Sequence, residues 1–443
     1  MLFKRKKETL LWIWLSLACK PGSTAFARLL KWNNFRGAQS VYDAADAELE
    51  RLFGKSTSAL SALKNKDLGQ SERILNYCDA MGIQVITYAD RQYPSSFKAI
   101  RLPPVLLYCK GTLPSSDCMK VGIVGTRSMT AYGKKHTFVI SSALASAGAV
   151  IVSGMARGID AVASAGALYA KGQTVVFLGC GIDRVYPPEH RLLSQAIEHA
   201  GAVLSEYPPG YAGDKYCFPV RNRLISAFSD CVFVAEGSAA SGALITAREA
   251  VAQGKPIFAL PGSIDRVTSE APRILLKSGA AAAECADDII RALSGEYPTE
   301  HMIRILEHPE PSLSTIDSVL SGYGILKEPP MLQRDEEVPV ATQAAYKKPK
   351  ATVASGAKKE TAPAEKAAPA KDEGKTGIKL ADPMKSVYLA MPNDAEIAFD
   401  ALCERLPDFD GKTLTTALSR LSVLGLVQSL SGERYKKVQK NIE

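Results

Sequence analysis

The sequence predicts an α/β fold in which a parallel sheet is covered by helices on both faces. Short apolar runs rich in β-branched residues recur between residues 120 and 260, and each leads into a turn and a helix-like pattern. Runs that are apolar throughout are typical of strands buried on both faces, and their alternation with helices indicates βα units. The clearest strands are expected at residues 121–124, 150–152, 174–178, 202–204, 231–234 and 257–260.

A small helical domain is expected over residues 1–70, because apolar patterns of helical length there are broken by Pro21-Gly22 and Gly54. The basic start and the apolar stretch 10–19 also resemble a secretory signal. That stretch is about half the length of a membrane span, and its pattern continues beyond Pro21-Gly22. We therefore expect a buried first helix and no membrane segment.

The main domain is expected over residues 71–298, with two extra edge strands at 82–87 and 103–108. Residues 299–382 are rich in Lys, Ala and Pro and poor in aromatic residues, which predicts a flexible linker. Residues 383–443 regain helical periodicity and end in a hairpin pattern, which predicts a winged helix. This last domain is neutral overall, so DNA and protein both stay open as its partner.

The composition gives a formal net charge of +8 over 443 residues, and most of the excess lies before residue 120. The nine cysteines form no CxxC pair, and the five histidines show no metal-ligand spacing. We therefore expect a reduced, cytoplasmic protein with no disulfide framework, no metal and no cofactor. Net charge alone does not indicate nucleic acid, because residues 120–290 are nearly balanced.

Two glycine-bearing turns follow the first two strands of the main domain. Gly125-Thr126-Arg127 forms the first turn, and Ser153-Gly154 with Arg157-Gly158 forms the second. Such turns present backbone N–H groups to anions at the carboxyl edge of a parallel sheet. The arginines add guanidinium groups that bind phosphate in bidentate geometry. Asp160 follows the second turn, where its expected role is to cap the helix.

Two later segments extend this predicted anion site. Phe218 precedes Arg221-Asn222-Arg223 at the start of an apolar helix, an arrangement that favours a phosphate clamp. Ser241-Gly242 opens another helix, with Thr246 one turn further on, and adds one more anion-binding turn. Several such turns on successive strand ends are less expected by chance than any one of them.

Several enzyme motifs are missing from the sequence. There is no GxxxxGK[ST] and no GxGxxG after the first strand, which excludes a P-loop ATPase and an ordinary dinucleotide site. No nucleophile and base accompany the turns, so we expect a site that binds phosphates rather than one that cleaves a substrate. The arginines also have a structural alternative, in which they pair with acidic side chains such as Glu206 or Glu236.

The order and spacing of these motifs over residues 70–290 resemble the DNA-processing protein A (DprA/Smf) family of bacterial single-stranded-DNA-binding proteins. The matching stretches are GTR at 125–127 with YG at 132–133, SG at 153–154 through GID at 158–160, GCGID at 179–183 through YP at 186–187, SEYPPG at 205–210, FP at 218–219, RNR at 221–223, SG at 241–242 with LITA at 244–247, and PG at 261–262. Ser164 and Ala271-Pro272-Arg273 depart from the family pattern.

The resemblance implies an extended Rossmann-like core with an N-terminal helical, SAM-like domain and a C-terminal winged helix. It implies a non-enzymatic homodimer that protects incoming single-stranded DNA and loads a RecA-type recombinase in natural transformation and homologous recombination. Arg127 and Arg157 would hold phosphate groups. The other implied DNA-binding residues are Gly125, Thr126, Ser153, Gly154, Gly158, Phe218, Arg221, Asn222, Arg223, Ser241, Gly242 and Thr246.

A nucleotide-processing hydrolase on the same kind of core is the alternative function. Phosphoribohydrolases carry a Pro-Gly-Gly-x-Gly-Thr turn with a following Glu, whereas the comparable stretch here is Pro261-Gly262-Ser263-Ile264-Asp265. A third function, regulation through DNA binding by the winged helix, is disfavoured by the neutral charge of that domain.

Release of free base separates the hydrolase from the DNA-binding protein. We expect the purified protein to release no base from nucleoside monophosphates, because no nucleophile-and-base set accompanies the phosphate-binding turns. Chromatography of the reaction mixture measures this, and release above a protein-free blank would favour the hydrolase.

Overall fold

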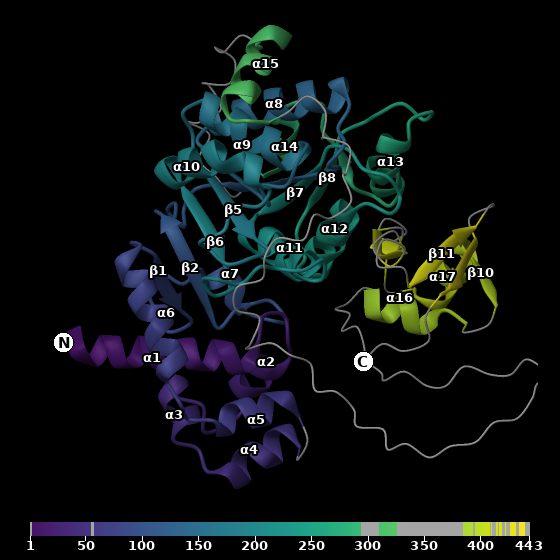
Figure 1. The fold of residues 1–443 in the computed structure, drawn as a ribbon. Helices are drawn as coiled ribbons and strands as arrows, with labels where there is room; N and C mark the ends of the chain where they lie inside the picture. Colours follow the sequence, from purple (N-terminus) through teal and green to yellow (C-terminus); the bar gives the residue numbers. More distant parts are fainter. Residues whose placement is uncertain are drawn as a thin grey trace, which may run out of the picture.

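The computed structural model describes residues 2–54, 57–293 and 310–325, together with most of 384–438. A nine-stranded sheet forms its centre, in the order β1-β2-β6-β5-β4-β3-β7-β8-β9 (Figure 1). Every strand pair from β6 to β9 in this order is parallel, whereas β2 and β1 are added antiparallel at the β6 edge. The predicted parallel sheet and its two extra edge strands are therefore confirmed. The strands are β1 (Gln84–Thr87), β2 (Leu106–Gly111), β3 (Lys120–Val124), β4 (Val150–Ser153), β5 (Thr174–Leu178), β6 (Ala202–Ser205), β7 (Cys231–Val234), β8 (Ile257–Ala259) and β9 (Ala281–Ala282).

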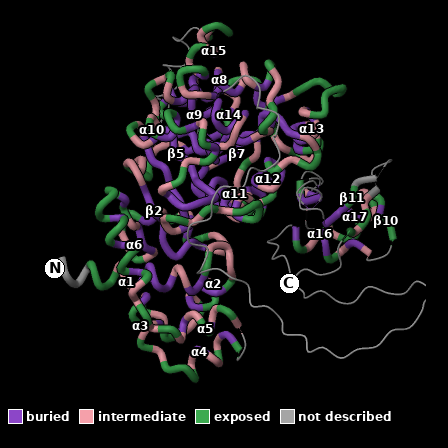
Figure 2. Tube along the Cα trace, in the orientation of Figure 1, coloured by how far each residue is buried: buried purple, intermediate pink, exposed green. Residues whose placement is uncertain are grey.

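Helices cover both faces of the sheet, and the strands between them are buried (Figure 2). Val121 and Ile123 of β3 belong to a core cluster with residues of α8, α9 and α14. Val124, which points to the other face, belongs to a cluster with residues of α11, α12 and α13. The helices around the sheet are α7 (Ser95–Lys98), α8 (Ala131–Ser146), α9 (Ile159–Tyr169), α10 (Arg191–Ala200), α11 (Cys217–Phe228), α12 (Gly242–Ala252), α13 (Glu270–Lys277) and α14 (Ala286–Leu293).

Helix α1 (Leu2–Cys19) is the centre of the N-terminal helical unit. Its residues Leu11, Trp12 and Leu15 are almost fully buried, which confirms the predicted buried first helix. No helix in the described part of the chain is long and apolar enough to cross a membrane. The boundary expected at residue 70 falls inside a helix, α6, that packs on α1. The other helices of the unit are α2 (Ala25–Leu30), α3 (Ala38–Tyr42), α4 (Asp46–Phe53), α5 (Ser58–Lys64) and α6 (Gly69–Ala80).

A helix within residues 299–382 contradicts the flexible linker that was expected there. Helix α15 (Leu313–Gly322) packs on α8 and α9, with Ile316 and Leu320 buried in the core. Its Asp317 forms an ion pair with Lys134 of α8 at 2.5 Å. The two apolar residues are four positions apart and give α15 one apolar face, which the Lys- and Pro-rich composition of the wider segment obscured. The remaining residues of the predicted linker, 299–309 and 326–382, lie outside the described residues.

The C-terminal unit has its own small core, which includes Val387, Leu402 and Leu418. Its described strands form a three-stranded sheet in the order β10-β12-β11. The third helix was predicted at 413–424, and the residues of this range that the structure describes, 413, 414, 416–418 and 421, are helical. The rest of the range lies outside the described residues, so the winged helix stays a prediction. The elements are α16 (Met384–Ala390), β10 (Glu396–Ala398), α17 (Phe399–Arg405), β11 (Val427–Leu430) and β12 (Arg434–Lys437).

We expect Ile316→Ala to lower the free energy of unfolding by about 2–4 kcal/mol, because the truncation leaves a cavity between α15 and the core. Leu313→Ala on the same helix is the matched control. Leu313 is exposed, so its truncation should change the free energy of unfolding by less than about 0.5 kcal/mol. Urea unfolding followed by circular dichroism measures both, and two equally small effects would show that α15 does not pack on the core.

Candidate functional site

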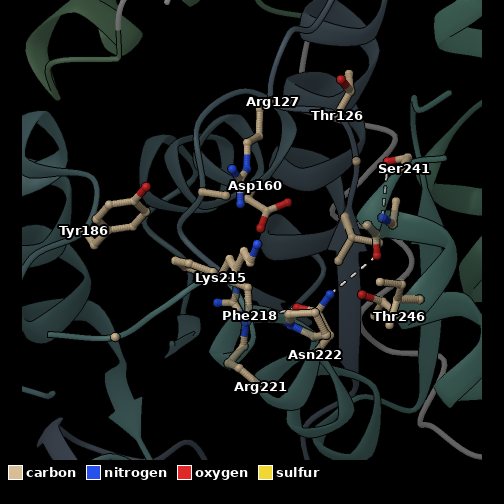
Figure 3. A pocket seen from close by; sticks show the side chains of 18 of the residues that line it. Thr126, Arg127, Asp160, Tyr186, Lys215, Phe218, Arg221, Asn222, Ser241 and Thr246 are labelled. Carbon is tan, nitrogen blue, oxygen red and sulfur yellow. Dashed lines mark hydrogen bonds between the residues drawn. The ribbon is translucent and has the colours of Figure 1, made fainter. Parts of the chain in front are cut away.

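A pocket of about 660 Å³ opens where β3 and β7 end (Figure 3). From β3 the chain runs through β4 and β5 to β6 on one side, and it then returns to form β7 on the other side of β3. The strand order therefore reverses between β3 and β7. Open α/β sheets bind ligands at such a point, outside the carboxyl ends of the strands. The predicted site residues that line the pocket are Gly125, Thr126, Arg127, Phe218, Arg221, Asn222, Ser241, Gly242 and Thr246.

Arg127 is an exposed cation just after β3. The backbone donors beside it are already used, because the Gly125 backbone hydrogen-bonds Asp160 and the Thr126 N–H donates to the Glu236 carbonyl oxygen at 2.8 Å. The Arg127 guanidinium lies 5.5 Å from the centre of the Phe218 ring. The described arginines that form ion pairs with carboxylates do not include Arg127. At this turn the guanidinium, rather than the backbone, is therefore the group that can bind an anion.

Arg221 is buried at the floor of the pocket, with 4% of its surface exposed. Its Nη1 donates to the carbonyl oxygens of Gly154, at 2.8 Å, and Phe177, and its Nε donates to the Asn222 side chain. Asp160 is buried in the same place. Burial raises the pKa of the Asp160 carboxyl, and the nearby Arg221 guanidinium opposes that rise. Arg221 thus shapes the pocket by holding α11 to the ends of β4 and β5.

The N-terminus of α12 lies across the pocket from Tyr186 (Figure 3). Ser241 caps this helix, and its Oγ accepts a hydrogen bond from the Ala243 N–H at 3.2 Å. Asn222 donates from Nδ2 to the Gly242 carbonyl oxygen at 3.4 Å, which links α11 to α12. The first turn of α12 lines the pocket, so the positive end of its dipole favours a negatively charged ligand there.

Lys215 and Tyr186 also line the pocket, although the sequence did not predict them as site residues. Lys215 is exposed on the loop before α11. Tyr186 packs on Phe218, with their ring centres 5.4 Å apart. The sequence did carry a signal for Lys215, because it stands among the aromatic residues Tyr216 and Phe218. Tyr186 belongs to a stretch that matches the family pattern, 179–187, but it was not predicted to bind DNA, and the fold brings it in on the loop after β5.

A small adjoining pocket holds the second predicted turn, and Gly154 and Arg157 line it together with Arg127 and Phe218. A Cβ atom on Gly154 would lie 2.5 Å from the Arg221 guanidinium, so only glycine permits this close approach. Arg157 donates from Nε to Glu189, so its charge is already paired with a carboxylate.

Three of the predicted site residues, Ser153, Gly158 and Arg223, line neither pocket. The Ser153 hydroxyl is buried and donates to a carbonyl oxygen of β3 at 2.7 Å, which ties β4 to β3. Gly158 has a φ of +74°, and a side chain there would collide with the Thr126 carbonyl oxygen. Arg223 forms a buried ion pair with Glu206 at 2.6 Å, so the structural alternative holds for this arginine. Across the described residues, no group of His, Cys, Asp or Glu is arranged to hold a metal ion.

The fold and site define a class of protein. Its members have a parallel α/β sheet and, where the strand order reverses, a pocket that is lined by aromatic residues and favours anions. The model of the family described as DNA recombination-mediator protein A matches residues 84–294, which hold this sheet and pocket. DNA processing protein DprA of Bacillus subtilis is 40% identical over 222 residues, which make up 50% of this chain and 75% of that protein. The chain belongs to this DNA recombination-mediator (DprA/Smf) family.

Two solved structures of family members are similar to this chain. The X-ray structure of DprA from Streptococcus pneumoniae is 30% identical, with a TM-score of 0.54, and the match covers 60% of this chain and 91% of that one. The structure of DNA processing protein A from Helicobacter pylori, described for its single-stranded DNA binding mode, is 34% identical with a TM-score of 0.44. It covers 48% of this chain and 98% of that one. The first match confirms the predicted α/β core.

Acid should destabilise the fold through His190, which lies in the short helix η1 (Pro188–His190) beside the second turn. The ring is buried, and its Nδ1 lies 3.0 Å from the Met155 carbonyl oxygen. Burial lowers the pKa of His190 below its ordinary value of 6.5. The unfolded chain therefore takes up a proton first as pH falls, and stability that is present above pH 6.5 is lost below it.

In the wild type, the free energy of unfolding should fall by up to about 1.4 kcal/mol per pH unit between pH 6.5 and 5. The His190→Gln variant should not show this fall. His199→Gln is the matched control, because it is the same substitution at an exposed histidine. Urea unfolding at several pH values measures the slope. A slope in His190→Gln equal to that of the wild type would contradict the assignment.

Proposed function

We propose that this chain binds single-stranded DNA in the pocket between β3 and β7 and delivers the strand to a RecA-type recombinase. The observation that carries the binding proposal is the presence of two exposed cations, Arg127 and Lys215, in a pocket that also presents the Phe218 ring. Cationic side chains bind phosphate groups, and aromatic rings stack on unpaired bases. This combination fits a single strand.

Neutral donors complete the proposed site. The Thr126 hydroxyl and the N-terminus of α12 at Ser241-Gly242 face the same pocket as the two cations. In this assignment Arg221 and Gly154 hold the pocket in shape, and they do not serve as the principal phosphate ligands.

The proposed role extends to a homodimer that protects incoming DNA in natural transformation and acts without cleaving it. The family's description as a recombination mediator supports a role in which the bound strand is passed on to another protein. The pocket also supports it, because two of its exposed charged groups, Arg127 and Lys215, are cations suited to holding phosphates. The third, the Asp214 carboxylate, accepts hydrogen bonds from the backbone N–H groups of Tyr216, at 2.7 Å, and Cys217, at 3.2 Å.

Arg127→Ala and Lys215→Ala should each weaken binding to a fluorescent oligo-dT strand by about tenfold, because each removes a charge-assisted hydrogen bond to phosphate. The slope of log affinity against log salt concentration should become shallower by about 0.7 in each variant, since one fewer counterion is released. Fluorescence anisotropy over a range of salt concentrations measures both quantities.

Arg73→Ala is the matched control, because Arg73 is exposed on α6 and does not line the pocket. It should bind the strand as the wild type does. Unchanged affinity in both pocket variants would contradict the proposal, and an equal loss in Arg73→Ala would show that only overall charge matters.

A further inference from the structure

Helix α11 has one face toward the pocket and another toward the rest of the protein. Phe218, Arg221 and Asn222 line the pocket, and Phe218 lies three and four residues before the other two, the spacing that puts side chains on one helical face. Val220 and Arg223 do not line it. Both make contacts that fix α11 in place, one with the N-terminal helical unit and one with the end of β6.

Val220 lies against the turn that follows α1. Gly22 in this turn has a φ of +71°, and a Cβ atom there would lie 2.5 Å from Cγ1 of Val220 and 3.1 Å from its Cγ2. The turn is held by the Lys20 N–H, which donates to the Ser16 carbonyl oxygen at 3.0 Å. Because α1 is itself buried in the N-terminal unit, the turn presents a firm surface to α11.

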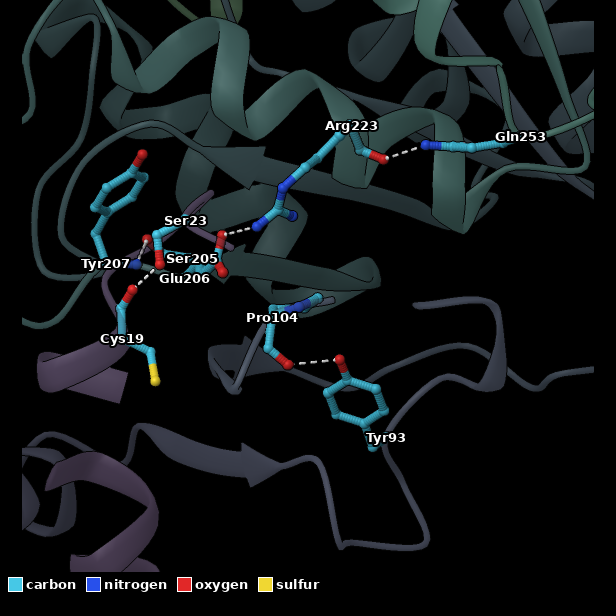
Figure 4. Close-up of polar contacts among 9 residues, drawn as sticks. All are labelled: Cys19, Ser23, Tyr93, Pro104, Ser205, Glu206, Tyr207, Arg223 and Gln253. Carbon is cyan, nitrogen blue, oxygen red and sulfur yellow. Dashed lines mark hydrogen bonds and ion pairs between the residues drawn. The ribbon is translucent and has the colours of Figure 1, made fainter. Parts of the chain in front are cut away.

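Arg223 anchors the same helix to the sheet, since it pairs with Glu206 just after β6 (Figure 4). Both side chains are less than one-tenth exposed. Burial raises the pKa of Glu206 and the Arg223 guanidinium opposes that rise, so each charge depends on the other. The loop that carries Lys215 runs from Glu206 to α11, and this ion pair therefore ties down the beginning of that loop.

The two exposed cations of the pocket are carried by different parts of the fold. Arg127 directly follows β3 and is attached to the sheet, whereas Phe218 belongs to α11 and Lys215 to the loop before it. The position of α11 relative to the sheet therefore sets how these groups are placed for one strand. The opposite end of α11 is held within the main domain, because Phe97 of α7 stacks on Phe228 with ring centres 5.8 Å apart.

We propose that the N-terminal helical unit sets the strand affinity of the pocket by positioning α11, through the contact of Gly22 with Val220. Val220 is then a positioning residue for DNA binding, and the Glu206–Arg223 pair is the second anchor. The inference rests on the proposed strand-binding function and adds to it a role for residues that do not touch the strand.

The test is a double-mutant cycle on the full chain, with oligo-dT affinity and thermal unfolding measured for each variant. Gly22→Ala places a methyl group against Val220 and should weaken strand binding by about fivefold, within the range of coupling between side chains in contact. Adding Val220→Ala removes both methyl groups that the new Cβ meets, so affinity should return to within about twofold of the wild type. The Tm should not recover, because the positive φ at residue 22 still strains alanine and buried methyl groups are lost.

Gly54→Ala is the matched control in the same helical unit. Gly54 also has a positive φ, +76°, but a Cβ atom there meets nothing within 4 Å. It should lower the Tm and leave strand affinity unchanged. Wild-type affinity in Gly22→Ala, an equal loss in Gly54→Ala, or no rescue in the double variant would overturn the inference while strand binding itself stands. Val220→Ala alone should weaken binding by about twofold and serves if Gly22→Ala does not fold. A wild-type chain that binds no strand would instead overturn the proposed function, and this inference with it.

Discussion

The pocket depends on the buried guanidinium of Arg221. This group hydrogen-bonds the carbonyl oxygens of Gly154 and Phe177, and so joins α11 to the ends of β4 and β5. It also faces the buried carboxylate of Asp160, which hydrogen-bonds the Gly125 turn after β3. A buried ion is tolerated only with such partners, so one charged arrangement fixes three strand ends and one helix. Gly154 must then be glycine, because the guanidinium occupies the space of a side chain.

Buried carboxylates at the neighbouring strand ends are satisfied in a similar way. Glu206 after β6 pairs with Arg223, and Glu236 after β7 accepts hydrogen bonds from the backbone N–H and hydroxyl of Thr130 at the start of α8. These carboxylates therefore bind partners within the protein. Arg127 and Lys215 are left exposed at the same edge of the sheet, which makes the pocket attractive to phosphates.

The sequence predicted the sheet and the place of the pocket because both follow from local patterns. Apolar β-branched runs mark buried strands, and the Gly125 and Ser241 turns follow strands whose ends meet at one edge. It could not tell that Arg127 is exposed and Arg223 is buried in an ion pair, since both stand next to strand or helix ends in motifs that are typical of phosphate binding. Only the fold shows that Glu206 reaches Arg223 and that the space beside Arg127 is open. Helix α15 was missed because its apolar face is short and because it was grouped with the Lys- and Pro-rich stretch that follows it in the chain.

The most direct measurement compares single-stranded with double-stranded DNA. The full chain is titrated with a labelled oligo-dT strand and with a blunt duplex of equal length in the same buffer. We expect the strand to bind at least about tenfold more tightly, because only unpaired bases can stack on rings such as Phe218. Equal or tighter binding of the duplex would contradict a pocket that holds a single strand.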